Sequence, residues 1–220
     1  MPLLIATRNP GKASEIRDLF AGLPIAIVFP EQVELKRLPE EEDLENADSY
    51  LGNAVAKARY FAGRSGLPTV ADDSGIEVDA LDGAPGVHSA RFAIRAGAVA
   101  PGQHPDDANN ALLLERLRGT PDAARTARYR CVVAHLDTAA APPEIVEAAC
   151  EGRILTAPAG SGGFGYDPLF FSTELLRGFG EVPPAMKHRV SHRGRAFRAL
   201  IEVLLRRELQ ARKQAQTRTK

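Results

Sequence analysis

Residues 69–78 read Thr69-Val70-Ala71-Asp72-Asp73-Ser74-Gly75-Ile76-Glu77-Val78 and give the clearest signal for the class of fold. A β-prone apolar run ends in two acids, a hydroxyl and a glycine, and apolar and acidic residues then alternate from Ile76 onward. Such residues and a period of two are typical of strands. The pattern predicts a segment that carries acidic side chains to the edge of a sheet.

The two neighbouring acids of this segment do not reach one site from a regular strand. Successive side chains of a strand point to opposite faces, so Asp72 and Asp73 enter one cleft only if a turn twists the chain between them. We expect one acid to work at a site and the other to support the turn. The alternative is that Asp-Asp-Ser-Gly is turn chemistry alone, because turns favour Asp, Ser and Gly.

The composition is that of an ordinary globular chain. It has 220 residues, of which 44% are apolar and 25% charged, and this suits one domain with a sizeable core. Lys plus Arg (28) balances Asp plus Glu (28), which gives no general reason to bind nucleic acid or a membrane surface. Neither a signal peptide, a membrane-length apolar run nor a CxxC pair is evident. We expect a cytoplasmic protein in which Cys131 and Cys150 are reduced.

The N-terminal segment combines a strand, a tight turn and a helix. Residues 3–6 are apolar, residues 7–12 form the turn, and apolar residues at helical spacing follow to Ala21. Backbone N–H groups of the turn and the positive end of the helix dipole offer a place for an anion, and Lys12 adds a mobile charge. The turn is not a Walker A loop, because Ala6 and Ala13 stand where that motif needs Gly and Ser or Thr. A phosphate site and a plain turn are both compatible with this pattern.

The middle of the chain alternates helices with strands. Strands are predicted at 25–29, 126–136 and 145–150, the last two as an antiparallel hairpin, and helices at 50–63 and 108–117. Asp48 or Ser49 can cap the first of these helices, on which Asn53 and Lys57 share one face. Taken by itself, Lys57 is a surface lysine. The acidic run from Glu40 to Glu45 is a solvated surface in which a single member could bind a metal ion.

A glycine-rich loop follows at Gly160 to Pro168. It contains G-x-G-x-x-G, but a strand is predicted after it at 169–171, where a dinucleotide-binding fold would need a helix. The loop can instead set the ring of Phe164 or Tyr166 against a flat base. The sequence therefore favours a stacking site over a Rossmann loop.

A basic cluster from Lys187 to Arg195 precedes the last predicted helix, at 196–212. Cations at the start of a helix are unfavourable unless an anion is bound there, which favours a ligand at this place. We expect one domain over residues 1–209 and a polar, disordered tail over 210–220.

Together these segments resemble the inosine triphosphate pyrophosphatase family, which hydrolyses non-standard purine nucleoside triphosphates such as dITP, ITP and XTP to the monophosphate and pyrophosphate. The matching motifs are residues 7–12 with Glu15, Glu45 ahead of 53–58, 71–75, 163–168, and Lys187 with 191–194. Their order, over nearly the whole chain, carries the resemblance. Three positions depart from it, because many members have Gly at Arg8, Glu at Gly52 and an acid at Met186.

The resemblance implies a role for each matching residue. The triphosphate would be held by Thr7, Arg8, Asn9, Pro10, Gly11, Lys12 and Lys57. Glu45 and Asp73 match the acids that bind Mg²⁺, Asp73 also matches the proton acceptor for the attacking water, and Ser74 matches a substrate contact. The nucleoside would be surrounded by Phe164, Gly165, Tyr166, Asp167, Lys187, His192 and Arg193.

These implied roles are chemically consistent. Mg²⁺ takes carboxylate and phosphate oxygens and keeps several waters, so two protein acids suffice. Lys12 and Lys57 would stabilise charge on pyrophosphate as it leaves the α-phosphorus. Arg193 is always a donor, so it would favour the 6-oxo group of hypoxanthine or xanthine over the 6-amino group of adenine.

The resemblance also implies the architecture, an α/β fold whose elongated mixed sheet forms two lobes flanked by helices with the nucleotide cleft between them. It implies a homodimer, and no nucleic acid or membrane is expected as a partner. Two rival functions are a metal-dependent phosphomonoesterase with Asp72 or Asp73 as nucleophile, which would release inorganic phosphate, and a nucleotide-binding module without turnover.

Overall fold

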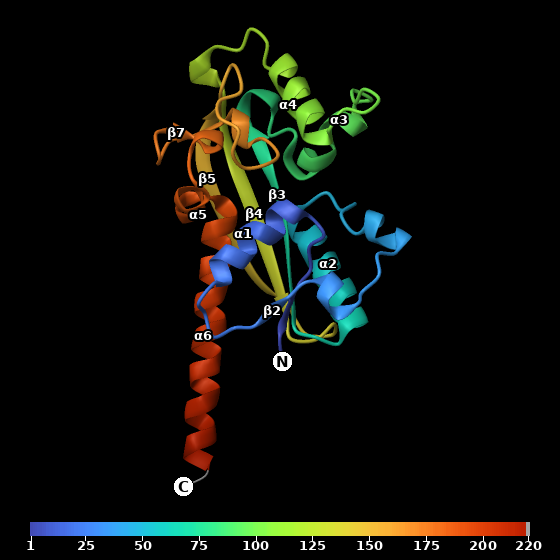
Figure 1. Ribbon diagram of the computed structural model, residues 1–220, viewed down its shortest axis with the longest axis vertical. Coiled ribbons are helices and arrows are strands. Elements are labelled where there is room, and N and C mark those ends of the chain that lie inside the picture. The colour runs from blue at the N-terminus through green and yellow to red at the C-terminus, as the bar shows by residue number, and fades with distance from the viewer. Residues whose placement is uncertain (219–220) are drawn as a thin grey trace.

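The protein is built on a mixed sheet of seven strands in the computed structural model, which describes residues 1–218 and the side chains of residues 1–210, 213 and 214 (Figure 1). In spatial order the strands are β2 (Ile27–Val28), β1 (Leu3–Ile5), β3 (Thr69–Val78), β4 (Thr126–Leu136), β5 (Glu144–Ile154), β6 (Phe170–Ser172) and β7 (Arg177–Gly178). β1 runs parallel to both β2 and β3, and the other neighbours are antiparallel. The predicted α/β class, the mixed sheet and the hairpin of β4 and β5 are confirmed.

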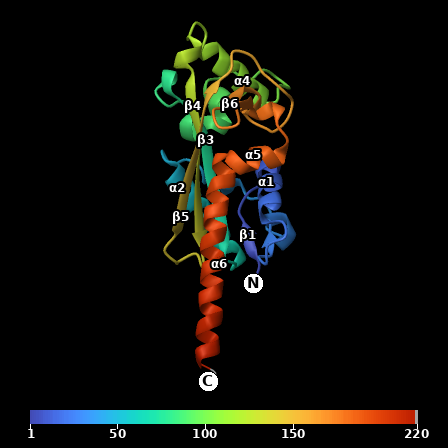
Figure 2. The same ribbon diagram turned by 90° about the vertical axis from the view of Figure 1, so that its left-hand side faces the viewer.

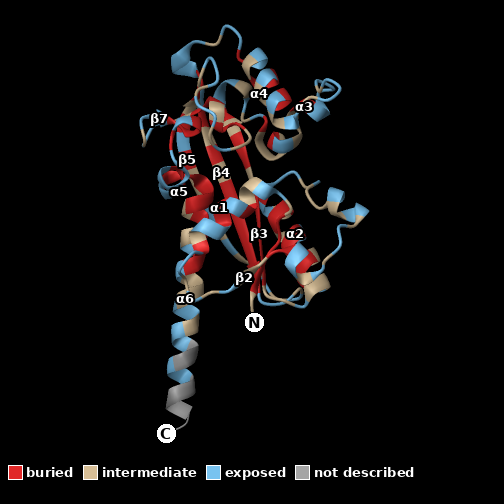
Figure 3. Ribbon diagram, viewed as in Figure 1, coloured by how far each residue is buried: buried red, intermediate tan, exposed pale blue. Residues whose placement is uncertain are grey.

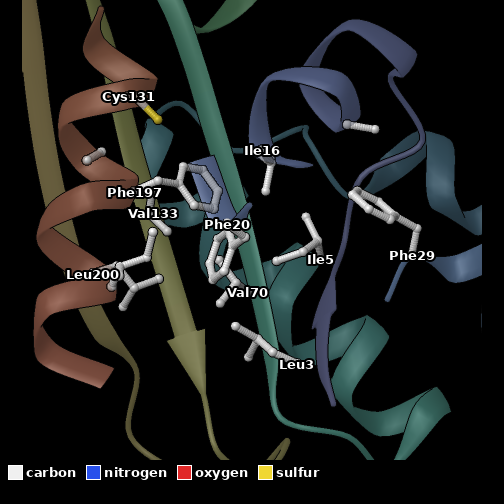
Figure 4. Packing of buried hydrophobic residues seen from close by; sticks show 13 residues of the cluster. Leu3, Ile5, Ile16, Phe20, Phe29, Val70, Cys131, Val133, Phe197 and Leu200 are labelled. Carbon is white, nitrogen blue, oxygen red and sulfur yellow. The ribbon is translucent and has the colours of Figure 1, made fainter. Parts of the chain in front are cut away.

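The helices of the described chain flank this sheet on both faces (Figures 1 and 2). They are α1 (Pro10–Phe20), α2 (Tyr50–Ser65), α3 (Phe92–Arg95), α4 (Pro105–Arg116), α5 (Pro184–Val190) and α6 (His192–Arg218). One core joins α1 and α6 to β1, β3 and β4, as Figure 4 shows for Phe20, Phe197 and Val70. A second core lies on the opposite face under α2, where Phe61 packs with Ala71.

The alternation of β3 assigns its two acids to these two faces. Val70 belongs to the core under α1 and α6, and Ala71 to the core under α2. Because strand side chains alternate, Asp72 lies on the face of α1 and α6, and Asp73 lies on the face of α2. Neighbouring acids therefore meet different sets of partners.

The Asp-Asp-Ser-Gly segment is not a turn, which corrects the sequence prediction. β3 continues through it, with Asp72 opposite Val133, Asp73 opposite Val132 and no break in the register with β4 as far as Val78. Ten consecutive residue pairs with β4 outweigh the local preference of Asp, Ser and Gly for turns. Asp72 consequently has no turn to support.

A third core fills the far end of the long strands. It packs Tyr129 of β4 against Phe170 and Phe179, with ring centroids 4.8 and 6.1 Å apart. Buried residues thus follow the central strands along most of their length, whereas the C-terminal part of α6 is mostly exposed over its described side chains (Figure 3). The sheet carries separate cores at its two ends, and the residues discussed below lie between them.

The C-terminal helix extends beyond its predicted bounds. α6 runs from His192 to Arg218, so much of the tail predicted to be disordered is helical, and the last two residues lie outside the described chain. Residues 205–214 are rich in Leu, Arg, Glu, Gln, Ala and Lys, which all have a high helix propensity. No helix within residues 1–218 has the length and apolarity needed to cross a membrane.

Candidate functional site

The predicted strand and helix at the N-terminus are confirmed and bring residues 7–12 to the site, but α1 begins at Pro10, within the predicted turn. Asn9 caps α1, since its side-chain oxygen accepts a hydrogen bond from the N–H of Lys12 at 2.9 Å. Pro10 occupies the first turn of the helix, where its missing N–H costs nothing. The cap and the proline fix where α1 begins and therefore where Lys12 emerges.

Two adjoining cavities are lined by almost all of the predicted site residues. The first, here called the aromatic cavity, is lined among others by Asn9, Lys12, Ser74, Phe164, Gly165, Tyr166, Asp167, Lys187, His192 and Arg193. The second, here called the charged cavity, is lined among others by Thr7, Arg8, Asn9, Lys12, Glu45, Lys57, Asp73 and Ser74. Asn9, Lys12 and Ser74 belong to both, so the two cavities meet at Lys12.

Pro10 and Gly11 line neither cavity, but Gly11 has a steric role beside the aromatic one. A Cβ atom at this position would lie 2.7 Å from the ring of Phe164. The glycine therefore lets α1 approach the glycine-rich loop closely, which brings the N-terminal turn and the aromatic cavity together.

The charged cavity is lined by two lysines and three acids, of which Glu41 is paired with Arg8. Lys57 of α2 forms an ion pair with Glu45, and Lys12 lies 3.1 Å from Asp72 through its ammonium group. Burial pushes the pKa of Glu45 upward, but Lys57 and Lys12 outweigh burial and lower it below the usual value. Glu45 is therefore ionised at neutral pH.

Asp73 is buried, being 5% exposed, and both of its oxygens accept hydrogen bonds. Its Oδ2 accepts from Nδ2 of Asn53 at 2.8 Å, and its Oδ1 accepts from the N–H of Ser74 at 3.0 Å. Burial raises the pKa of Asp73 above its usual value, and the charge of Glu45 adds to this. Two like charges facing one cavity in this way suit a cation between them.

No group of three or more His, Cys, Asp or Glu side chains in the described part of the chain is arranged to hold a metal ion. A site that offers two carboxylates fits Mg²⁺, which obtains its other ligands from phosphate oxygens and water. It does not fit structural zinc, which needs four protein ligands. Glu45 and Asp73 are thus the residues that could hold a hard divalent cation.

The aromatic cavity presents one half-buried ring and one neutral histidine. Phe164 is partly exposed, whereas Tyr166 is buried and donates its hydroxyl to the carbonyl of Ser89 at 2.8 Å. His192 stacks on Tyr129, with ring centroids 4.5 Å apart and planes 4° apart. Burial, together with the charge of Arg193, lowers the pKa of His192 well below its usual value. Of the two predicted rings, Phe164 is the one that a planar ligand can reach.

A buried ion-pair network joins the two cavities. It contains three cations and three acids, namely Lys12, Lys187, Arg193, Glu15, Asp72 and Asp167. Arg193 donates from Nη1 to Glu15 at 2.5 Å and from Nε to Asp72 at 3.3 Å. Since isolated buried charges are costly, this pairing is what allows so many of them below the surface.

Asp72 is a link in this network and not a turn residue. It is 1% exposed and lies between Lys12 of α1 and Arg193 of α6. These cations hold the pKa of its carboxyl well below the usual range although burial acts in the opposite direction. Asp72 therefore connects Lys12, where the cavities meet, to Arg193 in the aromatic cavity.

Arg8 lines the charged cavity but uses its guanidinium elsewhere. It binds Glu41 through Nε at 2.8 Å, Glu31 through Nη1 at 2.7 Å and the carbonyl of Leu35 through Nη2 at 2.8 Å. These partners lie in and between the short 3₁₀ helices η1 (Pro30–Val33) and η2 (Pro39–Asp43). Arg8 thus ties the N-terminal turn to the segment that leads to Glu45.

Four further residues belong to the site although they were not among the site residues predicted from the sequence. Asp72 and Glu15 carry the network, Asn53 binds Asp73, and Arg91 reaches the charged cavity from η4 (Gly86–Arg91), where it donates to the carbonyl of Glu45. The four-residue spacing of Asn53 and Lys57 was the available signal, because both face the acids from α2. Arg91 gave no local signal, since its partner lies 46 residues away.

Comparison with known proteins identifies relatives over nearly the full length. A model described as the Ham1 family matches residues 3–203. A dITP/XTP pyrophosphatase of Thioalkalivibrio sulfidiphilus is 46% identical over 205 residues, which covers 93% of this chain and 98% of the relative. One of Vibrio cholerae is 40% identical over 204 residues, covering 92% and 96%.

Solved structures show the same fold. A HAM1 protein from Coxiella burnetii superposes with a TM-score of 0.79 at 33% identity, covering 94% of this chain and 99% of that one. A nucleoside-triphosphatase, also described as a dITP/XTP pyrophosphatase, from Mycobacterium abscessus superposes with a TM-score of 0.65 at 41% identity, covering 91% and 98%.

Proposed function

The chain belongs to the Ham1 family, and from this we propose that it is a pyrophosphatase that hydrolyses dITP, XTP and ITP to the monophosphate and pyrophosphate. The observation that carries the proposal is the pair of adjoining cavities that meet at Lys12. One offers a partly exposed ring and donors for a base, and the other offers lysines and acids for a polyphosphate and its cation. A nucleoside triphosphate has these two chemical halves joined at the α-phosphate.

The polyphosphate is proposed to occupy the charged cavity. Lys12 and Lys57 supply positive charge there, and the N-terminus of α1 supplies backbone donors. Both lysines stabilise the negative charge that develops on pyrophosphate as it leaves.

Asp73 is proposed to accept the proton of the attacking water. The water oxygen bonds to the α-phosphorus, its proton passes to Asp73, and the bond to the bridging oxygen breaks so that pyrophosphate leaves with the bonding electron pair. Burial raises the pKa of Asp73, which makes its carboxylate a better proton acceptor than a solvated one. Lys57 and Asn53 keep this carboxylate charged and oriented.

Mg²⁺ is proposed as the cofactor, held by Glu45 and Asp73. The fit rests on two carboxylates that face one cavity and oppose each other's ionisation. When bound, the ion screens the phosphate charge and makes a water more acidic.

The base is proposed to stack on Phe164 and to be selected by Arg193. Three of the five N–H donors of Arg193 bind Glu15, Asp72 and Ser74, so donors are left for a ligand. The remaining N–H groups of Arg193 can donate a hydrogen bond but cannot accept one. They therefore favour a purine with a 6-oxo acceptor over one with a 6-amino donor. Neutral His192 adds a ring nitrogen, Nδ1, that has no hydrogen-bond partner among the described residues.

We further propose that the two ends of the long strands, with the helices packed on them, form two lobes on either side of the nucleotide. We also propose that the protein works as a cytoplasmic homodimer. The separate cores at the two ends of the long strands support the first point. Sedimentation of the full chain at twice its own mass would bear out the dimer, and sedimentation at its own mass would exclude it.

The test is product identification. The protein is incubated with dITP, XTP, ITP, ATP or GTP in Mg²⁺ or EDTA. We expect pyrophosphate from the first three in Mg²⁺, little from ATP and GTP, and none in EDTA. Single phosphates would indicate a phosphomonoesterase, binding without turnover would indicate a nucleotide-binding module, and equal turnover of ATP would contradict the role of Arg193.

A further inference from the structure

Asn53 links Asp73 to the loop that carries Glu45 through opposite ends of its amide. Its side chain is fully buried, at 0% exposure, on the face of α2 that points toward β3. Nδ2 donates to Oδ2 of Asp73 at 2.8 Å, and Oδ1 accepts from the backbone N–H of Ala47 at 2.9 Å. Ala47 follows Glu45 by two residues in the loop before α2.

We propose that Asn53 is a positioning residue that sets Glu45 relative to Asp73. This inference rests on the proposed function, because it takes these two acids as the cation site. Asn53 touches neither the substrate nor the ion and acts through the two groups that it holds.

The chemistry of the two partners leaves Asn with few substitutes. The N–H of Ala47 requires an acceptor, and an ionised Asp73 requires a donor, so the orientation of the amide is fixed. Asp would offer an acceptor on both sides and would put a second carboxylate against Asp73. Leu has a similar size but offers neither group, and it would leave buried polar atoms unpaired on both sides.

Further contacts hold the loop that carries Glu45 against α2. Ser49 caps α2 through the N–H of Gly52 at 3.1 Å, and a Cβ at Gly52 would lie 2.8 Å from Cβ of Ala47. The absence of a side chain at Gly52 therefore lets the loop lie against α2 close enough for Asn53 to reach it. Lys57, one turn further along α2, pairs with Glu45 itself.

The bond from Asn53 also leaves Asp73 able to bind a cation. Each carboxylate oxygen of Asp73 accepts one hydrogen bond, from Asn53 and from the N–H of Ser74, and each has further lone pairs for a ligand. Second partners of this kind fix the orientation of a ligating carboxylate, and their loss typically costs about 10–100-fold in metal affinity or activity.

The test compares Asn53→Leu and Asn53→Asp with the wild type. Mn²⁺ is titrated into each full-length protein with a non-hydrolysable α,β-methylene analogue of dITP, and free Mn²⁺ is followed by electron paramagnetic resonance. For Asn53→Leu we expect the Kd of Mn²⁺ to rise about 10–100-fold. In steady-state assays, kcat for dITP should fall by a similar factor in both variants, with KM changed far less.

Two controls separate positioning from loss of stability or added charge. Leu200→Ala removes a fully buried side chain on α6, so it lowers the melting temperature and should leave the Kd of Mn²⁺ unchanged. Gln210→Glu adds the same charge as Asn53→Asp to an exposed position of α6 outside both cavities, and kcat should be unchanged.

A wild-type Kd for Mn²⁺ in Asn53→Leu, or a wild-type kcat in Asn53→Asp, would overturn the inference. If Asn53→Leu does not fold, the kcat of Asn53→Asp decides alone. The proposed function is judged separately by Asp73→Asn: full activity of that variant would remove the basis of both, whereas an inactive Asp73→Asn beside unaffected Asn53 variants would reject the inference alone.

Discussion

Asp72 and Asp73 are neighbours in the sequence but have different environments and different chemical roles. Asp72 lies between Lys12 and Arg193, which keep its carboxyl ionised, and so it serves as a fixed counter-charge. Asp73 faces α2 and has its pKa raised by burial, which suits a group that takes up a proton. The pleat of β3 produces this division without any irregularity of the backbone.

Arg193 is the residue on which base selection depends. Arg193→Lys keeps a positive charge but loses the planar fork that binds Glu15, Asp72 and Ser74 together. Since a hydrogen bond to a charged group contributes about 1.5–3 kcal/mol, we expect kcat/KM for dITP to fall about 10–100-fold. The preference for dITP over ATP should fall with it. Steady-state kinetics with both substrates checks this, and an unchanged preference would show that another residue selects the base.

Many residues of the site could be predicted one by one from the sequence, but the residues that they contact could not. The lining of the cavities by Lys12, Glu45, Lys57 and Asp73 agrees with the expected set, because ordered motifs mark these positions. The contact of Arg193 with Asp72 spans 121 residues, and local patterns hold no information about it. The turn expected at Asp72 failed for the same reason, since pairing with β4 outweighed the local preference.

At the scale of elements, Glu15 fastens α1 to the two C-terminal helices. It binds Lys187 of α5 at 2.7 Å and Arg193 of α6 at 2.5 Å. Burial acts to raise the pKa of Glu15, but Arg193 and Lys187 outweigh it and lower the pKa from 4.5 to about 2. One ionised carboxylate thus orients two residues of the aromatic cavity from a third helix.

This shift predicts a specific dependence of stability on pH. Because the folded pKa lies below the unfolded one, Glu15 stabilises the protein above its unfolded pKa of 4.5, and the contribution is lost as the pH falls toward 2. It is on the order of 3 kcal/mol. In urea unfolding, the difference in free energy between wild type and Glu15→Gln should shrink as the pH falls through this range. A difference that stays constant would show that Glu15 is not ionised by this network.

The elements themselves divide into those that the sequence specifies and those that it does not. β4 has the predicted bounds because polar and apolar residues alternate from Thr126 to Cys131 and a mainly apolar run follows to Leu136, and α2 begins after its predicted cap at Ser49. α6 exceeds its prediction because helix propensity continues where polarity suggested disorder. Arg8 was expected at the phosphate, but Glu31 and Glu41, more than twenty residues away, take its guanidinium.

For the whole molecule, the arrangement of the sheet explains why the site lies where it does. α1 and α6 on one face and α2 on the other each contribute charged groups to the level of β3 where Asp72 and Asp73 lie. The glycine-rich loop joins them because α4 holds it, with Asp106 accepting from the N–H of Gly165 at 2.9 Å. Residues from both ends of the chain thereby line the two adjoining cavities.

In the proposed reaction, water attacks the α-phosphorus of a non-standard purine nucleoside triphosphate where the two cavities meet. Hydrolysis of dITP in ¹⁸O-labelled water with Mg²⁺, followed by mass spectrometry of both products, tests it most directly. We expect pyrophosphate as the leaving group and the label in the nucleoside monophosphate. Label in pyrophosphate would mean attack at the β-phosphorus, and labelled single phosphate would mean a phosphomonoesterase. Either result would exclude the proposed reaction.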